Sequence, residues 1–175
     1  STFHIENILA AYTVSKILNI FDNDFKNILS NFEGLPHRSE KIFKNNSFQI
    51  INNSKATNLH ATIKSIENFD NIHLILGGRA KEKDFDKIIK FKERINQVYL
   101  IGESSPQIYN DLKNELICKN CLTLDIALES IFKNISLSEK FQTILFSPAC
   151  SSFDQFIDFE DRGEYFKKMV KIYIT

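Results

Sequence analysis

The chain has 175 residues, of which 43% are hydrophobic and 25% are charged, and its 22 basic side chains are balanced by 22 acidic ones. This length suits one domain with a small appendage, and the balanced charge argues against a protein that works on nucleic acid or on an anionic membrane surface. Three cysteines cannot form a disulfide framework, and no apolar run reaches the ~18–20 residues of a membrane span, so we expect a soluble, cytoplasmic, globular protein.

The first part of the chain is predicted to be helical. Between residues 5 and 20 the apolar side chains recur at the spacing of one helix face. Asp22 resembles the N-cap of a second, shorter helix, and Pro36 is expected to end this helical part because proline interrupts a helix. We therefore expect residues 1–34 to form a short α-helical appendage ahead of a domain formed by residues 35–175.

The rest of the chain alternates between strands and helices. Asn45-Asn46 predicts the turn of a β-hairpin between segments 41–43 and 48–52. Near-continuous apolar runs are typical of parallel strands that are covered on both faces, and they occur at 72–76, 98–101 and 143–146. Helices are predicted at 57–69, 84–90, 106–116, 125–132 and 161–171. This alternation predicts an α/β fold, with a mostly parallel, Rossmann-like sheet flanked by helices.

Polar segments follow three of the predicted strands, at residues 52–58, 77–81 and 147–156. Ligands of parallel α/β sheets bind outside the carboxyl ends of the strands, which is where these segments would meet. They supply two lysines, an arginine and several hydroxyl groups, and helix N-termini would add free N–H groups. We therefore expect a binding site for a small anion at this edge.

Other short motifs favour structural roles. Gly77-Gly78 fits a tight turn, because it matches neither the dinucleotide fingerprint nor the P-loop pattern. Cys118 and Cys121 have CxxC spacing and are expected just before a strand, but the second pair that a structural zinc site needs is missing. Cys150 follows the last strand, yet no histidine is placed by the sequence to activate it as a nucleophile.

Several strings together are more specific than any one of them. In their order and spacing they resemble the C-terminal domain of the Mur ligase family, in its D-glutamate-adding branch, over nearly the whole chain. The strings are Leu35-Pro36-His37-Arg38, Asn53-Ser54-Lys55-Ala56-Thr57-Asn58, Leu76-Gly77-Gly78-x-x-Lys81, Ser147-Pro148-Ala149-Cys150-Ser151-Ser152-Phe153-Asp154-Gln155-Phe156 and Phe159-Glu160-x-Arg162-Gly163. In addition, Asn7-Ile8-Leu9-Ala10-Ala11 is similar to the helix near the adenine in the family's central domain.

This resemblance implies an ATP- and Mg²⁺-dependent ligase of peptidoglycan precursor synthesis. Such a ligase joins D-glutamate to UDP-N-acetylmuramoyl-L-alanine through an acyl phosphate. Residues 1–34 would be the tail end of the central ATPase domain, and residues 35–175 the C-terminal D-glutamate-binding domain. The positions that match D-glutamate contacts are Thr57, Lys81, Ser152, Phe153 and Phe159, and those that match nucleotide contacts are Asn7, Arg38, Asn53 and Lys55. The resemblance implies no catalytic residue and no metal ligand in this chain.

The sequence also departs from the family. Asn53 replaces an aspartate that is associated with the ATP ribose, and His4 replaces an asparagine. The central ATPase domain with its P-loop and the UDP-sugar domain are absent from the sequence, so we interpret the chain as part of a longer ligase. The alternative is a stand-alone, non-enzymatic module that binds an anion or a nucleotide.

The isolated 175-residue chain is expected to have no ligase activity, because it lacks the loop that cradles the phosphates during phosphoryl transfer. The assay measures ADP release by the purified chain with ATP, Mg²⁺ and UDP-N-acetylmuramoyl-L-alanine, with and without D-glutamate. ADP release that depends on D-glutamate would contradict this expectation.

Overall fold

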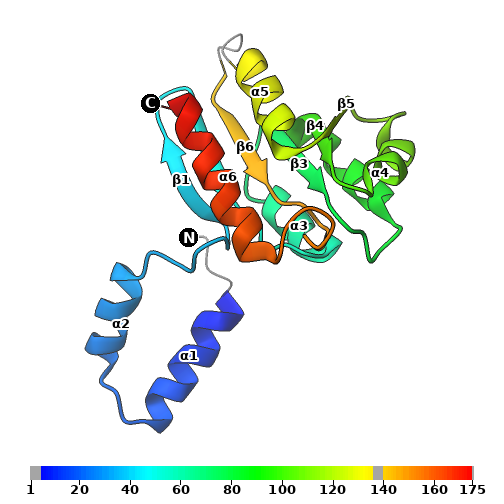
Figure 1. Ribbon diagram of the computed structural model, residues 1–175. Helices are drawn as coiled ribbons and strands as arrows, with labels where there is room; N and C mark the ends of the chain where they lie inside the picture. Colours follow the sequence, from blue (N-terminus) through cyan, green and yellow to red (C-terminus); the bar gives the residue numbers. More distant parts are fainter. Residues whose placement is uncertain (1–4, 136–139, 175) are drawn as a thin grey trace. The chain divides into compact units, whose positions relative to one another are not determined.

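The computed structural model describes residues 5–135 and 140–174, so His4 lies outside the described residues (Figure 1). The chain divides into two compact units, Ser1–Pro36 and His37–Thr175. The division falls after Pro36, close to the boundary expected after Gly34. The assignment of the two units to particular domains of a ligase stays a prediction.

The described part of the N-terminal unit consists of helices α1 (Ile5–Ile17) and α2 (Asp22–Asn31). The helices pack through Tyr12 and Phe25, whose ring centroids lie 5.2 Å apart. Two helices are therefore confirmed here, and the first is three residues shorter than predicted. Large apolar side chains of this unit remain exposed, among them Ile5, Leu9, Ile17, Phe21 and Ile28.

The prediction that Asp22 caps α2 is wrong, because Phe21 occupies the N-cap position and Asp22 is the first helical residue. The Asp22 carboxylate instead accepts hydrogen bonds from Lys16 Nζ at 2.9 Å and from the Tyr12 hydroxyl at 3.1 Å. The lysine holds the pKa of Asp22 below its usual value. The opposite charge on α1 thus takes the carboxylate away from the backbone N–H groups of α2.

A six-stranded sheet forms the centre of the C-terminal unit, in the order β1-β2-β6-β3-β4-β5. Its strands are β1 (Glu40–Lys44), β2 (Phe48–Asn52), β3 (Ile72–Gly77), β4 (Ile95–Ile101), β5 (Cys118–Leu122) and β6 (Gln142–Phe146). β1 pairs with β2 in the antiparallel sense, and the other neighbours are parallel. The predicted hairpin and the α/β fold with a mostly parallel sheet are confirmed.

Helices cover both faces of this sheet (Figure 1). One face packs against α3 (Leu59–Ile66), the 3₁₀ helix η1 (Phe85–Arg94) and α4 (Ser105–Leu112). The other face packs against α5 (Leu124–Ile135) and α6 (Phe159–Ile174). Successive residues of β3 alternate between these two cores: Leu74 and Leu76 face the first, and Ile75 faces the second. Burial on both sides explains the continuous apolar runs.

The helices α3 and α4 are shorter than predicted, and two further elements differ from the prediction in kind. Cys118 and Cys121 lie within β5 rather than before a strand, and in this edge strand the exposed Lys119 and Asn120 separate the half-buried Cys118 from the buried Cys121. The segment predicted as a helix at 84–90 is a longer 3₁₀ helix with a kink at Phe91. Among the residues that the structure describes, no helix combines the length and apolar character needed to cross a bilayer.

His73 lies in β3 within a buried polar network near the amino ends of the strands. Its Nδ1 is 3.1 Å from the Tyr99 hydroxyl, and its Nε2 contacts Gln142 Oε1. Tyr99 also reaches Gln97 Oε1, at 3.0 Å. Burial lowers the pKa of His73 below the ordinary 6.5, because a charged imidazole is poorly solvated there.

This lowered pKa makes stability depend on pH. As the pH falls below about 6.5, the unfolded chain takes up a proton at His73 before the folded chain does, so the free energy of unfolding falls. Urea unfolding of the wild type and of His73→Gln between about pH 7 and pH 5 checks this. We expect a smaller loss of stability in the variant, and parallel curves would contradict the assignment.

Candidate functional site

The loops that follow β2, β3 and β6 are joined by backbone hydrogen bonds at the carboxyl edge of the sheet. Asn53 N donates to Phe146 O at 2.8 Å. Arg79 and Ser151 form an isolated antiparallel bridge, with N–O distances of 2.9 and 3.1 Å in the two directions. The three polar segments identified in the sequence therefore meet at one edge, as predicted.

Gly78 makes this close approach of the loops possible. Its φ of +131° is a conformation that other residues rarely adopt. A Cβ atom at this position would lie 2.3 Å from Ser151 O and 3.1 Å from the Arg162 guanidinium. The glycine pair therefore serves the packing of the β3 and β6 loops, in agreement with the interpretation as a tight turn.

Arg162, in the first turn of α6, is the largest fully buried side chain and is 1% exposed. Its Nε donates to Ser54 Oγ at 3.0 Å and its Nη2 to Ser54 O at 2.9 Å. Its Nη1 donates to Cys150 O at 3.1 Å. A single guanidinium thus connects the loop after β2, the loop after β6 and the start of α6.

No carboxylate of the described residues forms an ion pair with Arg162, and its hydrogen-bond partners are carbonyl and hydroxyl oxygens. Burial lowers the pKa of Arg162 to about 10, and the guanidinium therefore stays charged at neutral pH. The network continues through Ser54, whose Oγ donates to Phe159 O at 2.8 Å. Ser54 thereby ties the first residue of α6 to the β2 loop.

Gly163, the residue that follows Arg162 in α6, allows His37 to pack against this helix. A Cβ atom on Gly163 would lie 2.2 Å from the His37 Nδ1 atom. The buried imidazole also lies 3.0 Å from Asn52 Nδ2 and 3.4 Å from the Glu164 carboxylate. The segment that enters β1 is thus fixed against both the end of β2 and α6.

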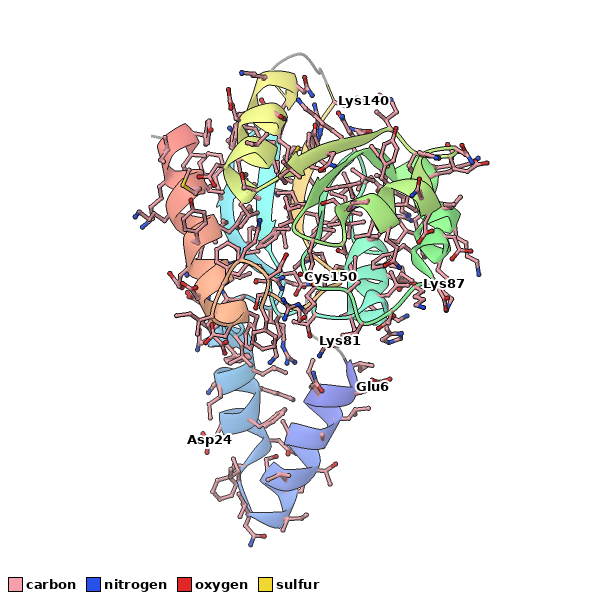
Figure 2. All side chains as sticks on the ribbon, turned by 45° about the vertical axis from the view of Figure 1, so that its right-hand side comes forward. Glu6, Asp24, Lys81, Lys87, Lys140 and Cys150 are labelled. Atoms are coloured by element: carbon pink, nitrogen blue, oxygen red, sulfur yellow. The ribbon has the colours of Figure 1, made fainter. Side chains whose placement is uncertain are left out.

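The residues predicted to bind D-glutamate lie at or next to this edge. Lys81 is exposed and follows the Arg79–Ser151 bridge by two residues; Figure 2 shows it at the lower edge of the C-terminal unit. Ser152 is buried, Phe153 is exposed, and Thr57 and Phe159 are half-buried. The bridge therefore brings the segment of Lys81 beside the segment of Ser152 and Phe153.

The predicted nucleotide residues are more dispersed. The Lys55 Nζ atom lies 3.9 Å from the centre of the Phe159 ring, which joins this residue to the predicted D-glutamate set. Arg38 is exposed, whereas Asn53 is only 5% exposed and its amide is hydrogen-bonded within the protein. Asn7 is exposed on α1, in the N-terminal unit.

The cysteines do not form a reactive group. Cys118 and Cys121 belong to the cores on opposite faces of the sheet. Burial raises the pKa of Cys118 and of Cys150 to about 11, which disfavours their thiolates at neutral pH. Cys150 lies inside the unit in Figure 2. Within 5–135 and 140–174, no group of three or more His, Cys, Asp or Glu side chains is placed to hold a metal ion.

Arg162 and Ser54 have no role predicted from the sequence, although both stand in the strings that carry the resemblance. A charged residue next to a glycine in the first turn of a helix looks like a solvated side chain. The signal that could have identified Arg162 is its place between the half-buried Phe159 and the buried Phe166, on the face of α6 that packs against the sheet.

No protein-family model matches the chain. The chain is 39% identical over 164 residues to the UDP-N-acetylmuramoylalanine–D-glutamate ligase of Wolbachia pipientis wMel. The alignment covers 94% of the chain and 32% of that protein. The chain is 37% identical over 172 residues to the ligase of that name from Prochlorococcus marinus (strain MIT 9312), covering 95% and 36%. The chain is thus homologous to these ligases along nearly its whole length, and it spans about a third of theirs.

A solved structure shares the fold. A crystal structure of Mycobacterium tuberculosis folylpolyglutamate synthase, complexed with ADP and AMPPCP, aligns with a TM-score of 0.59 and 13% identity. The alignment covers 90% of this chain and 38% of that one. The resemblance to Mur ligases found in the sequence is confirmed by the homology, and the synthase confirms the fold.

Replacement of Arg162 by methionine should lower the free energy of unfolding by roughly 3 kcal/mol or more, since it leaves buried oxygens of Ser54 and Cys150 without donors. Lys168→Met, an exposed change on the same helix, should stay within about 0.5 kcal/mol. Urea unfolding measures both. Equal stability of the two variants would show that the buried network contributes little.

Proposed function

We propose, on the premise of its homology to UDP-N-acetylmuramoylalanine–D-glutamate ligases, that this chain is the D-glutamate-binding part of such an ATP-dependent ligase. Its task would be to hold D-glutamate with the amine directed at the activated carboxyl group of UDP-N-acetylmuramoyl-L-alanine. The observation that carries the proposal is the 39% identity over 94% of the chain. Peptidoglycan precursor synthesis and a cytoplasmic location follow from the same proposal.

Lys81 is the cation best suited to bind a carboxylate of D-glutamate. No carboxylate of the described residues pairs with it, whereas the nearby Arg79 is bound to Glu103 at 2.8 Å. Thr57 and the buried Ser152 add hydroxyl donors, and Phe159 adds a backbone N–H at the start of α6. One charge and several neutral donors match a dicarboxylate.

The nucleotide side of the proposal rests on Arg38 and Lys55, which are exposed cations of the type that polyphosphates attract. ATP with Mg²⁺ would supply the phosphoryl group that activates the carboxylate. Because the described residues hold no candidate metal cluster, we assign Mg²⁺ to no residue of this chain. Asn7, in the N-terminal unit, is proposed as an adenine contact on the sequence resemblance alone.

The chain's chemical contribution would be orientation. The lone pair of the deprotonated D-glutamate amine forms the new C–N bond at the activated carbonyl carbon, phosphate leaves with the electrons of the C–O bond, and the proton lost by the nitrogen passes to the departing phosphate or to solvent. Holding the amine at the correct distance and angle is worth up to ~7–11 kcal/mol of the barrier. Lys81 and the hydroxyl groups bind the carboxylates, so the amine stays free to react.

Titration of D-glutamate into the ¹⁵N-labelled chain tests this proposal by NMR. Lys81→Ala should weaken D-glutamate binding by about tenfold or more, because it removes a charged hydrogen bond of ~1.5–3 kcal/mol. Lys83→Ala, which removes an exposed lysine of the same loop, is the matched control and should change affinity by less than about twofold.

L-Glutamate, with the same charges and the opposite configuration, should bind more weakly than D-glutamate. Equal losses of D-glutamate affinity in Lys81→Ala and Lys83→Ala would show that Lys81 does not bind D-glutamate. Binding of ATP without any binding of D-glutamate would favour the non-enzymatic nucleotide-binding module instead.

A further inference from the structure

Arg38 is carried by a backbone turn of unusual geometry. The residues on either side of it, His37 and Ser39, have φ angles of +61° and +48°. This left-handed conformation is costly for residues that have a Cβ atom, and it persists only where surrounding contacts enforce it. The contacts that hold this turn therefore decide where the exposed guanidinium of Arg38 is presented.

Asn53 provides one of these contacts on the Ser39 side. Its Oδ1 accepts a hydrogen bond from Ser39 N at 3.1 Å. Its Nδ2 donates to Ser65 Oγ at 2.6 Å and to Ser147 Oγ at 3.2 Å. The side chain thus links the turn to α3 and to the end of β6, both of which belong to the rigid centre of the unit.

The His37 side of the turn is held by neighbours of Asn53. His37 O accepts a hydrogen bond from Lys55 N at 3.0 Å, and its imidazole lies 3.0 Å from Asn52 Nδ2. His37 N donates to the Glu40 carboxylate at 2.9 Å. Residues 52–55, at the end of β2 and just after it, therefore hold the Arg38 turn on both sides.

We propose that Asn53 is a positioning residue, which holds the turn that presents Arg38 to a polyphosphate and does not itself bind the nucleotide. The inference rests on the proposed function and revises the contact first expected for Asn53. Both N–H groups of its amide are donated within the protein, and the residue is 5% exposed. Arg38, by contrast, is exposed.

A double-mutant cycle with ATP as the probe tests this inference. ATP is titrated into the chain and into Asn53→Ala, Arg38→Ala and the double variant, followed by NMR. We expect Asn53→Ala to weaken ATP binding by about three- to tenfold, and to have no further effect once Arg38 is gone. Hydrogen exchange at the Ser39 amide should accelerate in Asn53→Ala, since its acceptor is lost.

Equal effects of Asn53→Ala in the presence and absence of Arg38 would overturn the inference, because they would mean an independent contact with ATP. Ser65→Ala is the control: it removes a partner of the Asn53 amide but leaves the bond to Ser39, so ATP affinity should stay within about twofold. A loss as large as that of Asn53→Ala would also overturn the inference.

Asn53→Asp carries the same test if Asn53→Ala does not fold. A carboxylate keeps the acceptor for Ser39 N and removes both amide donors, while the Ser65 and Ser147 hydroxyls can turn to donate to it. ATP affinity within about threefold of the wild type supports positioning, and a tenfold loss overturns it. Failure of the wild-type chain to bind ATP would contradict the proposed nucleotide contacts and, with them, this inference. Failure of the wild-type chain to bind D-glutamate would contradict the proposed substrate site.

Discussion

The buried charge of Arg162 is the constraint on which the arrangement of the site depends. A guanidinium removed from water must be surrounded by oxygen atoms, and no carboxylate of the described residues forms an ion pair with this one. The oxygens come from Ser54 and Cys150, so the loops after β2 and β6 must converge on the start of α6. Lys55 follows Ser54 directly and lies over Phe159, and this contact brings the two predicted ligand sets together.

The fold was predictable wherever burial leaves a simple pattern. β3, β4 and β6 are covered on both faces, and their apolar runs identify them without further information. β5 was missed because it is an edge strand in which Cys121 is buried but Lys119 and Asn120 are exposed, a pattern shared with many loops. The start of α2 was misplaced because Lys16, on another helix, attracts the carboxylate of Asp22. Such competition between elements is invisible to a local pattern.

The meeting of the polar loops at one edge of the sheet could be predicted, but the hydrogen-bond partners within those loops could not. Polar segments after parallel strands indicated this edge, and the matched strings named Lys81 and Ser152 as candidates. Whether a polar residue faces a ligand or the protein depends on partners far away in the sequence. Asn53 bonds to Ser147, 94 residues later, and Ser54 to Arg162, 108 residues later. No local spacing rule reports such pairs, so the sequence pattern alone did not indicate the internal hydrogen bonds of Asn53 or any role for Arg162.

The position of β6 in the sheet has a consequence for how the chain folds. This strand lies between β2 and β3, yet it comes after every other strand in the sequence. During synthesis the chain therefore first contains two separate parts, the β1–β2 hairpin and the β3–β4–β5 sheet, each with an unpaired edge. Parallel pairing between distant segments is slow, and open strand edges can pair with other chains. Insertion of β6 pairs the open edges of β2 and β3 in one step and leaves β1 and β5 as the two edge strands of the finished sheet.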